Sequence, residues 1–320
     1  MTMVNTAHPM SARTAASLFF HLICGTFVPD KLWLCRRFRT KFLLRSLLFP
    51  ATTFRFLQSL ARLPSMGIAL DKQGLLPAKI HRPYLLAGLS VSARARALTD
   101  HYQFTQSLKN PALRQLLQAR EEATLVTFTG KNGEYFDIGC CSGHFDREGE
   151  VTLVVKYNDV TLAALSFSVI QKAGLTSVVI GGLQGPRKDI SNDIIREATK
   201  ASFGLFPKRV LMEVLFILAG QCDIKQIFAV SDDNHVFRSL RYRHSKKDHL
   251  FASYSDFWSS LHGTLSNDGL YALPLAMPRK ELEQIVSKKR SEYRRRYELL
   301  DNMAAQLLQT VNSSTPVQSA

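Results

Sequence analysis

The chain has 320 residues, of which 46% are hydrophobic and 21% are charged, so it is long enough to bury a full core, and a wholly disordered protein is excluded. Its formal net charge of +15 is expected to attract phosphate-bearing partners, whether nucleic acid, anionic lipid or a nucleotide-like cofactor. The five cysteines include no C-x-x-C pair, which predicts neither a disulfide framework nor a metal site and favours a reducing compartment.

Residues 14–29, TAASLFFHLICGTFVP, form an apolar stretch near the start of the chain. A membrane-spanning helix needs about 20 mainly apolar residues, whereas this stretch is shorter and contains His21, Gly25 and Pro29. No small-x-small cleavage site follows it, so a secretory signal is not predicted either. We therefore expect a cytoplasmic protein.

Residues 1–64 are predicted to form a basic, helical and amphipathic region. Asp30 is their one acid, against nine cations: Arg13, Lys31, Arg36, Arg37, Arg39, Lys41, Arg45, Arg55 and Arg62. On a helix, one face would hold cations, and another would hold Leu34, Phe38, Leu44, Leu47 and Leu48. This pattern favours peripheral binding to the anionic surface of the inner membrane. The alternative is a helix that packs on the core with its basic side in water.

Residues 65–122 are predicted to be a helical linker region. Glycines and prolines predict turns throughout residues 65–90. Two helices are expected to follow, one from Ser90 to Leu108 and one that starts at Pro111, because proline is favoured in the first helical turn. Neither helix contains a pattern that indicates chemistry.

Residues 123–278 have the hydrophobic period of β-strands in their first part. Short segments compatible with hairpins separate five β-rich runs: LVTFT, YFDIGCCSG, VTLVVKY, TLAALSFSVI and SVVIGG. Two helices are expected next, within residues 191–203 and 207–220. A helical crossover before KQIFAVS predicts that this strand is parallel to an earlier one. The predicted fold is α/β (α+β): an antiparallel meander with helices and one parallel strand.

Residues 279–311 are predicted to form a long basic helix. Its middle contains one acid, Glu292, and six cations: Lys288, Lys289, Arg290, Arg294, Arg295 and Arg296. No DNA-binding motif accompanies this run, so a phosphate-bearing lipid or another anionic membrane surface is favoured over nucleic acid as its partner. Residues 312–320 are expected to form a frayed tail.

A family resemblance rests on four segments that occur in a fixed order. They are IGGLQGPR at 180–187, AVSDDNHVFRSLRYR at 229–243, SYSDFWSSLHG at 253–263 and SKKRSEYRRRYELLD at 287–301. These segments resemble the VirK/YbjX family, also called DUF535, of enteric and related bacteria. The resemblance covers most of the chain. It implies a role in virulence and in the survival of antimicrobial peptides and other envelope stress.

The expected order of strands and helices is also similar to that of the GCN5-related N-acetyltransferases. In that family, backbone N–H groups between the fourth strand and the next helix hold the pyrophosphate of coenzyme A. The similarity implies an acyl-CoA or similar acyl donor held by Gly181, Gly182, Leu183, Gln184, Gly185, Arg187 and Lys188. The family motif Q/R-x-x-G-x-G/A is not met, because Arg187 and Asp189 stand where its glycines belong. The alternative is a tight strand exit with positive φ at one or two glycines.

Polar residues follow the KQIFAVS strand, at a position where α/β sheets often bind ligands. Asn234 and His235 are candidate catalytic residues there, with His235 as general acid or base and Asp232 orienting it. His262, beside Gly263, is a third candidate, because a histidine in a loop can reach a substrate. The alternative for the aspartates and the asparagine is to cap the helix that follows.

These features predict an acyl or aminoacyl transferase that acts at the inner leaflet of the membrane without a metal. Its acyl donor would bind in an open notch between the strands that end at Gly182 and Ser231. The alternative is a non-enzymatic factor whose basic N-terminal region and C-terminal helix bind anionic lipid or a partner protein.

Overall fold

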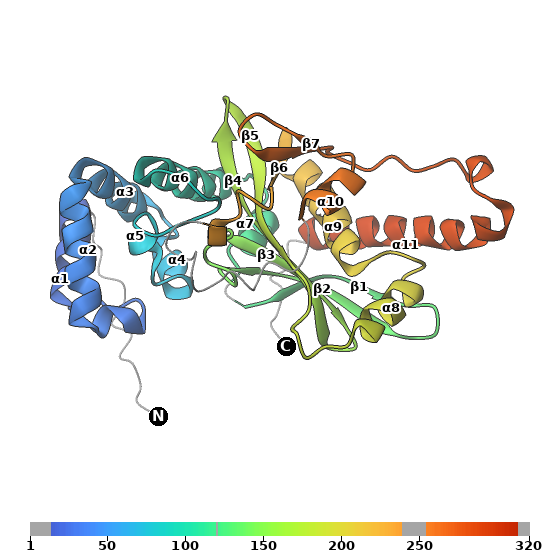
Figure 1. The fold of residues 1–320 in the computed structure, drawn as a ribbon. Helices are drawn as coiled ribbons and strands as arrows, with labels where there is room; N and C mark the ends of the chain where they lie inside the picture. The colour runs from blue at the N-terminus through green and yellow to red at the C-terminus, as the bar shows by residue number, and fades with distance from the viewer. Residues whose placement is uncertain (1–13, 120, 239–253, 313–320) are drawn as a thin grey trace.

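The computed structural model describes residues 14–119, 121–238 and 254–312, and one eight-stranded sheet runs through its centre (Figure 1). The strand order is β1-β2-β3-β4-β5-β6-β8-β7. The strands are β1 (Ala123–Thr129), β2 (Tyr135–Ser142), β3 (Val151–Tyr157), β4 (Val160–Lys172), β5 (Leu175–Gln184), β6 (Gln226–Val230), β7 (Thr264–Leu265) and β8 (Leu270–Leu273). Helices cover both faces of the sheet, so the described residues form three layers (Figure 1).

The first five strands form the antiparallel meander that the hydrophobic pattern predicts. Two-residue turns connect β3 to β4 and β4 to β5. Asn158 and Asp159 have φ angles of 44° and 65°, and Ala173 and Gly174 have φ angles of 51° and 79°. Positive φ at both central residues is typical of the type I′ turn, whose twist matches that of two paired strands. These turns fix the register at both ends of β4.

β6 joins the sheet parallel to β5, as predicted for KQIFAVS. The two strands pair over residues 177–180 and 226–229. The crossover between them consists of α8 (Asn192–Ala201) and α9 (Pro207–Gln221). Ser191 caps α8 and Pro207 occupies the first turn of α9, so both helices start at their predicted signals.

The main hydrophobic core lies on the face of the sheet that α9 covers. Leu153 and Leu165 from the strands pack in this core with Leu211 and Leu215 from α9. The other helices that contribute to it are α7 (Pro111–Leu117), α8, α10 (Tyr254–Ser260) and α11 (Ser287–Asn312). This core joins the first strands of the meander to the last helix of the chain.

The N-terminal helices cover the opposite face and form a second core with Val179, Phe228 and Val230 of the sheet. They are α1 (Ala15–Cys24), α2 (Arg36–Leu48), α3 (Pro50–Arg62), α4 (Met66–Lys72), α5 (Leu76–Lys79) and α6 (Val91–Ser107), with a 3-10 helix, η1 (Lys31–Leu34). α6 lies against the sheet, and α1 and α2 lie farthest from it (Figure 1). The expectation of turns throughout residues 65–90 is wrong, because burial of Leu70 and Leu76 stabilises α4 and α5.

α2 packs on the core through a face that the sequence pattern did not indicate. Phe42 and Ser46 are its buried residues. Leu44, Leu47 and Leu48 are 56%, 65% and 72% exposed. The leucines of the predicted apolar face therefore lie in water, whereas Phe38 of that face packs against the second core.

α11 begins at Ser287, later than the predicted start of the helix at residue 279. A separate 3-10 helix, η4 (Leu282–Gln284), precedes it, and the buried Ile285 lies between the two in extended conformation. The Arg290 guanidinium donates to the carbonyl oxygen of Ile285 at 2.9 Å, which stabilises this break. Asn312, the first residue of the predicted tail, ends α11, and the rest of that tail lies outside the described residues. No helix that the structure describes is long and apolar enough to cross a membrane.

Candidate functional site

β5 and β6 diverge where the predicted cofactor segment begins. β5 continues to Gln184, whereas its pairing with β6 ends at Ile180. Three side chains gather at the divergence: Glu148 from the β2–β3 connection, His235 after β6, and Tyr254 from α10. They are 1%, 0% and 4% exposed. The chain itself therefore occupies the space between the two strand ends.

Gly181 and Gly182 allow the Glu148 segment to approach the backbone of β5. A Cβ on Gly181 would clash with the carbonyl oxygen of Glu148, and a Cβ on Gly182 would clash with its Oε2. Neither glycine has a positive φ, and both lie within β5. The alternative of a tight turn with positive φ is therefore wrong. Glycine is required at these two positions because the Glu148 segment lies too close for a side chain.

Glu148 and His235 form a buried pair of a carboxylate and an imidazole. His235 Nε2 lies 3.3 Å from Glu148 Oε1, and the side-chain amide of Gln184 donates to the same oxygen at 2.7 Å. His235 Nδ1 accepts from the N–H of Phe237 at 3.3 Å, whereas His235 Nε2 is buried and makes no hydrogen bond to another described residue. Glu148 Oε2 is buried and has no hydrogen-bond partner among the described residues. Such an oxygen is costly to bury and is compatible with a functional role.

The predicted cofactor residues divide into two groups. In the first group, residues 181–184, the N–H of Leu183 already donates to the Tyr254 hydroxyl at 3.4 Å. In the second group, Gly185 lies at the surface beside a cavity of about 480 Å³, and the exposed Arg187 and Lys188 follow it. An anion can therefore approach the second group without displacing the side chains that contact the first.

Two of the predicted catalytic residues lie away from the Glu148–His235 pair. The side-chain amide of Asn234 donates to the carbonyl oxygen of Asp268 at 3.1 Å, although its backbone precedes His235 directly. His262 is exposed in the turn after α10 and has a φ of 60°. No contact among the described residues brings it to His235. Catalytic roles for Asn234 and His262 stay predictions.

Asp232 has a different role from the predicted orientation of the imidazole. Its carboxylate accepts from the N–H groups of Tyr254 and Ser255 at 2.8 and 3.2 Å. It therefore caps α10, which begins 22 residues later in the chain. This cap differs from the predicted one, which was for the helix that follows directly and whose residues 239–243 lie outside the described residues.

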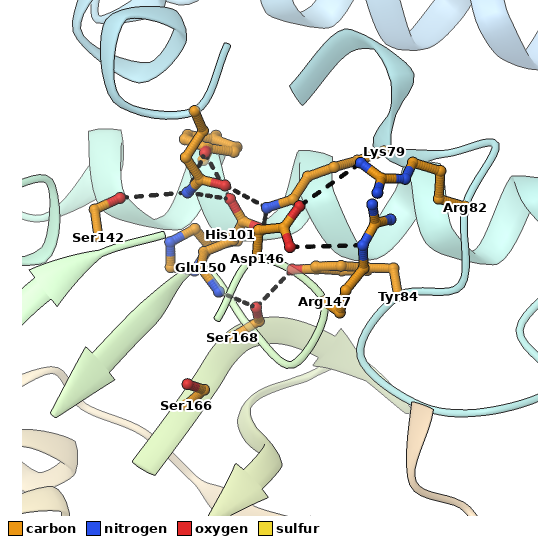
Figure 2. A network of polar contacts seen from close by, with 12 residues as sticks. Lys79, Arg82, Tyr84, His101, Ser142, Asp146, Arg147, Glu150, Ser166 and Ser168 are labelled. Atoms are coloured by element: carbon orange, nitrogen blue, oxygen red, sulfur yellow. Dashed lines mark hydrogen bonds and ion pairs between the residues drawn. The ribbon is translucent and has the colours of Figure 1, made fainter. Parts of the chain in front are cut away.

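A second buried polar cluster lies two residues farther along the same connection, at Glu150 (Figure 2). The ammonium of Lys79, from the end of α5, lies 2.5 Å from Glu150 Oε1, and both side chains are 1% exposed. The Tyr102 hydroxyl and the Gln73 amide donate to Oε2 at 2.6 and 2.8 Å. This cluster joins the helices of the second core to the sheet.

The electrostatics of the cluster indicate a structural role. Burial by itself would raise the pKa of Glu150, but the nearby Lys79 and its hydrogen bonds outweigh burial and hold the pKa below its usual range. Burial raises the pKa of Tyr84 well above its ordinary value, and the Tyr84 and Ser168 hydroxyls lie 2.7 Å apart (Figure 2). Both oxygens of Glu150 have partners, so this carboxylate is fully satisfied, unlike Glu148.

Sequence reasoning missed both Glu148 and Glu150. They lie in HFDREGE, residues 144–150, which was interpreted as a turn between two strands. The segment does connect the antiparallel β2 and β3, yet Arg147, Glu148 and Glu150 are 6%, 1% and 1% exposed. The length of this connection was the sign that could have indicated buried residues, because it is longer than the two-residue turns that follow in the meander.

Residues 31–309 match the profile of a family described as protein of unknown function (DUF535). The chain belongs to the DUF535 family. This DUF535 chain is 38% identical over 301 residues to uncharacterized protein YbjX of Escherichia coli strain K12, covering 93% of the chain and 91% of that protein. It is 30% identical over 224 residues to an uncharacterized protein of Haemophilus influenzae, covering 69% of the chain and 72% of that protein. No solved structure gives a significant match.

The resemblance to the VirK/YbjX family, predicted from four segments, is thereby confirmed. The matched range of the DUF535 profile includes α2, the Glu148–His235 pair and all but the last three residues of α11. The similarity to the N-acetyltransferases stays a prediction about the fold.

Proposed function

We propose that this DUF535 protein binds the anionic surface of the bacterial inner membrane and acts there in envelope defence and virulence. The outer face of α2 and the residues next to it support this proposal. Large apolar side chains are exposed there, namely Leu34, Leu44, Leu47, Leu48 and Phe49, with exposed fractions of 65%, 56%, 65%, 72% and 45%. Insertion of apolar side chains and pairing of cations with anionic headgroups are the two contributions to peripheral binding.

Cations accompany this apolar face with almost no opposing acid. Arg36, Arg37 and Lys41 are exposed on α2. Asp30 is the one acid within residues 14–70. A cationic surface with protruding leucines matches an anionic bilayer in both charge and polarity. The resemblance to VirK/YbjX proteins, with its link to surviving antimicrobial peptides, favours the same location.

Replacing Arg36, Arg37 and Lys41 together by glutamine is expected to weaken binding to anionic membranes about hundredfold, because each cation near such a surface contributes about 1 kcal/mol. The measurement is flotation of the full chain with phosphatidylcholine vesicles that contain phosphatidylglycerol. Binding of the unaltered protein should fall steeply as the salt concentration is raised.

The matched control removes the same charge from α11 by replacing Lys288, Lys289 and Arg294 with glutamine. This variant should bind like the unaltered protein, because the apolar side of α11 is buried in the main core. Replacing Leu44 and Leu47 by serine should weaken binding at every salt concentration, since salt does not screen apolar contacts. Equal losses from the two charge variants, or an unaltered protein that does not float, would refute the proposal.

Acyl-group transfer is the second candidate function, and the Glu148–His235 pair favours it. Glu148 Oε2 would accept the proton of an acceptor amine or hydroxyl, while the side-chain amide of Gln184 holds Oε1. The acceptor attacks the carbonyl carbon of an acyl or aminoacyl donor. The bond from that carbon to the leaving atom breaks, and Glu148 returns the proton to the leaving group. A CoA-like donor would lie beside Gly185, where the cavity leaves room for it.

Glu148→Gln is expected to lower the rate of acyl transfer about hundredfold or more, because it removes the general base. Release of CoA thiol from acetyl-CoA, in the presence of simple amine acceptors, gives the rate. Acetyl-CoA should raise the Tm of both the unaltered protein and Glu148→Gln, since the donor site is intact. The exposed Glu121→Gln is the control and should keep full activity. No Tm shift with any acyl-CoA would count against this function.

A further inference from the structure

The cavity beside Gly185 lies on the face of the sheet that α9 covers. It is bounded by β4, the end of β5, α8, α9 and α10. Its volume of about 480 Å³ falls within the range of about 300–1,000 Å³ that is typical of small-molecule sites. The apolar part of its lining includes Leu162, Pro186, Ile195, Phe206, Phe257 and Leu261.

Lys208 differs from the other polar residues of this lining. Arg209 Nη2 lies 2.7 Å from Glu213 Oε1, so its charge is paired. The Ser260 hydroxyl donates to the carbonyl oxygen of Phe257 at 2.7 Å. Lys208 has neither a hydrogen bond nor an ion pair from its side chain to another described residue. The half-buried Lys208 therefore borders an apolar cavity without a counterion among the described residues.

The surroundings of Lys208 favour an anion. Burial lowers the pKa of Lys208, which means that its ammonium has lost hydration. α9 begins at Pro207 without a side-chain cap, and the start of a helix carries partial positive charge. A bound anion would compensate both charges.

We propose that this cavity binds an amphiphile whose acyl chain lies against Phe257 and Leu261 and whose anionic group pairs with Lys208. A small polar ligand would leave the apolar lining unmatched, and a purely apolar ligand would leave Lys208 without a counterion. The site is independent of the proposed membrane contact, because α2 and this cavity lie on opposite sides of the sheet (Figure 1).

Two sources supply this chemistry. A free long-chain fatty acid carries a carboxylate at the end of its chain, whereas a long-chain acyl-CoA carries phosphates beyond its thioester. Calorimetric titration of the full chain with palmitate, palmitoyl-CoA and CoA alone, each below its micelle concentration, distinguishes them. The acyl-CoA case rests on the acyl-transfer candidate, because a thioester bound here would make a long acyl chain the group that is transferred.

Gly185→Leu adds a bulky side chain to the lining of the cavity. A Cβ on Gly185 meets no atom within 4 Å, so a larger side chain enters open space without disturbing β5. Gly220→Leu is its matched control, because a Cβ there also meets no atom within 4 Å and Gly220 is not part of the cavity lining. Lys208→Gln removes the cation and leaves the apolar lining intact.

We expect palmitate or palmitoyl-CoA to bind the unaltered protein and Gly220→Leu equally. Lys208→Gln should bind about tenfold more weakly, and Gly185→Leu should show no binding. Preference for palmitate over palmitoyl-CoA would assign a fatty acid, and the reverse would assign the thioester. CoA alone binding as tightly as palmitoyl-CoA, unchanged binding by Gly185→Leu, or no binding of either acyl ligand would overturn the proposal. CoA binding without chain dependence would still leave the acyl-transfer candidate standing.

Discussion

Replacing Lys79 by methionine is expected to lower the free energy of unfolding by about 3–5 kcal/mol, because the charge of Glu150 would stay buried without its counterion. Both side chains are 1% exposed, so water cannot take the place of the ammonium. The hydrogen bonds that Glu150 keeps, from Tyr102 and Gln73, compensate only in part. Equilibrium unfolding in urea, followed by circular dichroism, measures the change.

Arg196→Ala is the matched control, because its ion pair with Asp193 is exposed and such pairs contribute about 0–1 kcal/mol. The double variant Lys79→Met with Glu150→Gln should be more stable than Lys79→Met alone, since it buries no uncompensated charge. A double variant as unstable as the single one would attribute the loss to packing of the lysine stem instead of to charge.

The titration of His101 alone is expected to lower the free energy of unfolding by about 3 kcal/mol as the pH falls from about 6.5 to about 4. Burial lowers the pKa of His101 from 6.5 to about 4. In this window the imidazole takes up a proton in the unfolded chain but stays neutral in the folded protein. The unfolded state therefore binds more protons, so the contribution of His101 is complete above its unfolded pKa and is lost as the pH falls to its folded pKa.

His101→Gln is the variant that checks this prediction. His101 Nδ1 accepts from the N–H of Val169 at 3.2 Å, and glutamine keeps an acceptor while removing the titration. The measurement is the drop in the free energy of unfolding between pH 7 and pH 4. This drop should be about 3 kcal/mol smaller in the variant than in the unaltered protein. Some dependence should remain, because burial also lowers the pKa of His81 to about 4. An unchanged dependence in His101→Gln would contradict the assignment.

The first six strands of the sheet were predictable from the sequence because their signals are local. Period-two apolar runs mark the strands, and the adjacent pair Asn158 and Asp159 supplies a turn that tolerates positive φ. The parallel pairing of β6 followed from the presence of two helices before it. None of these inferences needed knowledge of a distant contact.

The candidate site was predictable only where it lies at a strand end. His235 and Gly182 were found because they follow or close recognisable strands. Glu148 was missed, because its burial depends on Gln184 and His235, which are distant in sequence. A polar residue in a connecting segment gives no local sign of such partners.

The orientation of α2 could not be predicted from its sequence pattern either. The helix carries apolar residues on more than one side, and the pattern alone cannot state which side packs. Phe42 is the side chain that enters the core, where its ring lies 5.1 Å from the ring of the fully buried Trp33. That contact turns Leu44 and Leu48 outward.

The sheet cannot be separated from the N-terminal helices without exposing part of the second core. Val179, Phe228 and Val230 of the sheet depend on the N-terminal helices for their cover. A shortened protein that starts at Ala123 would expose these side chains and would also lack Lys79. The strands are therefore not an autonomous folding unit, and recombinant fragments cut near residue 122 would be prone to aggregate.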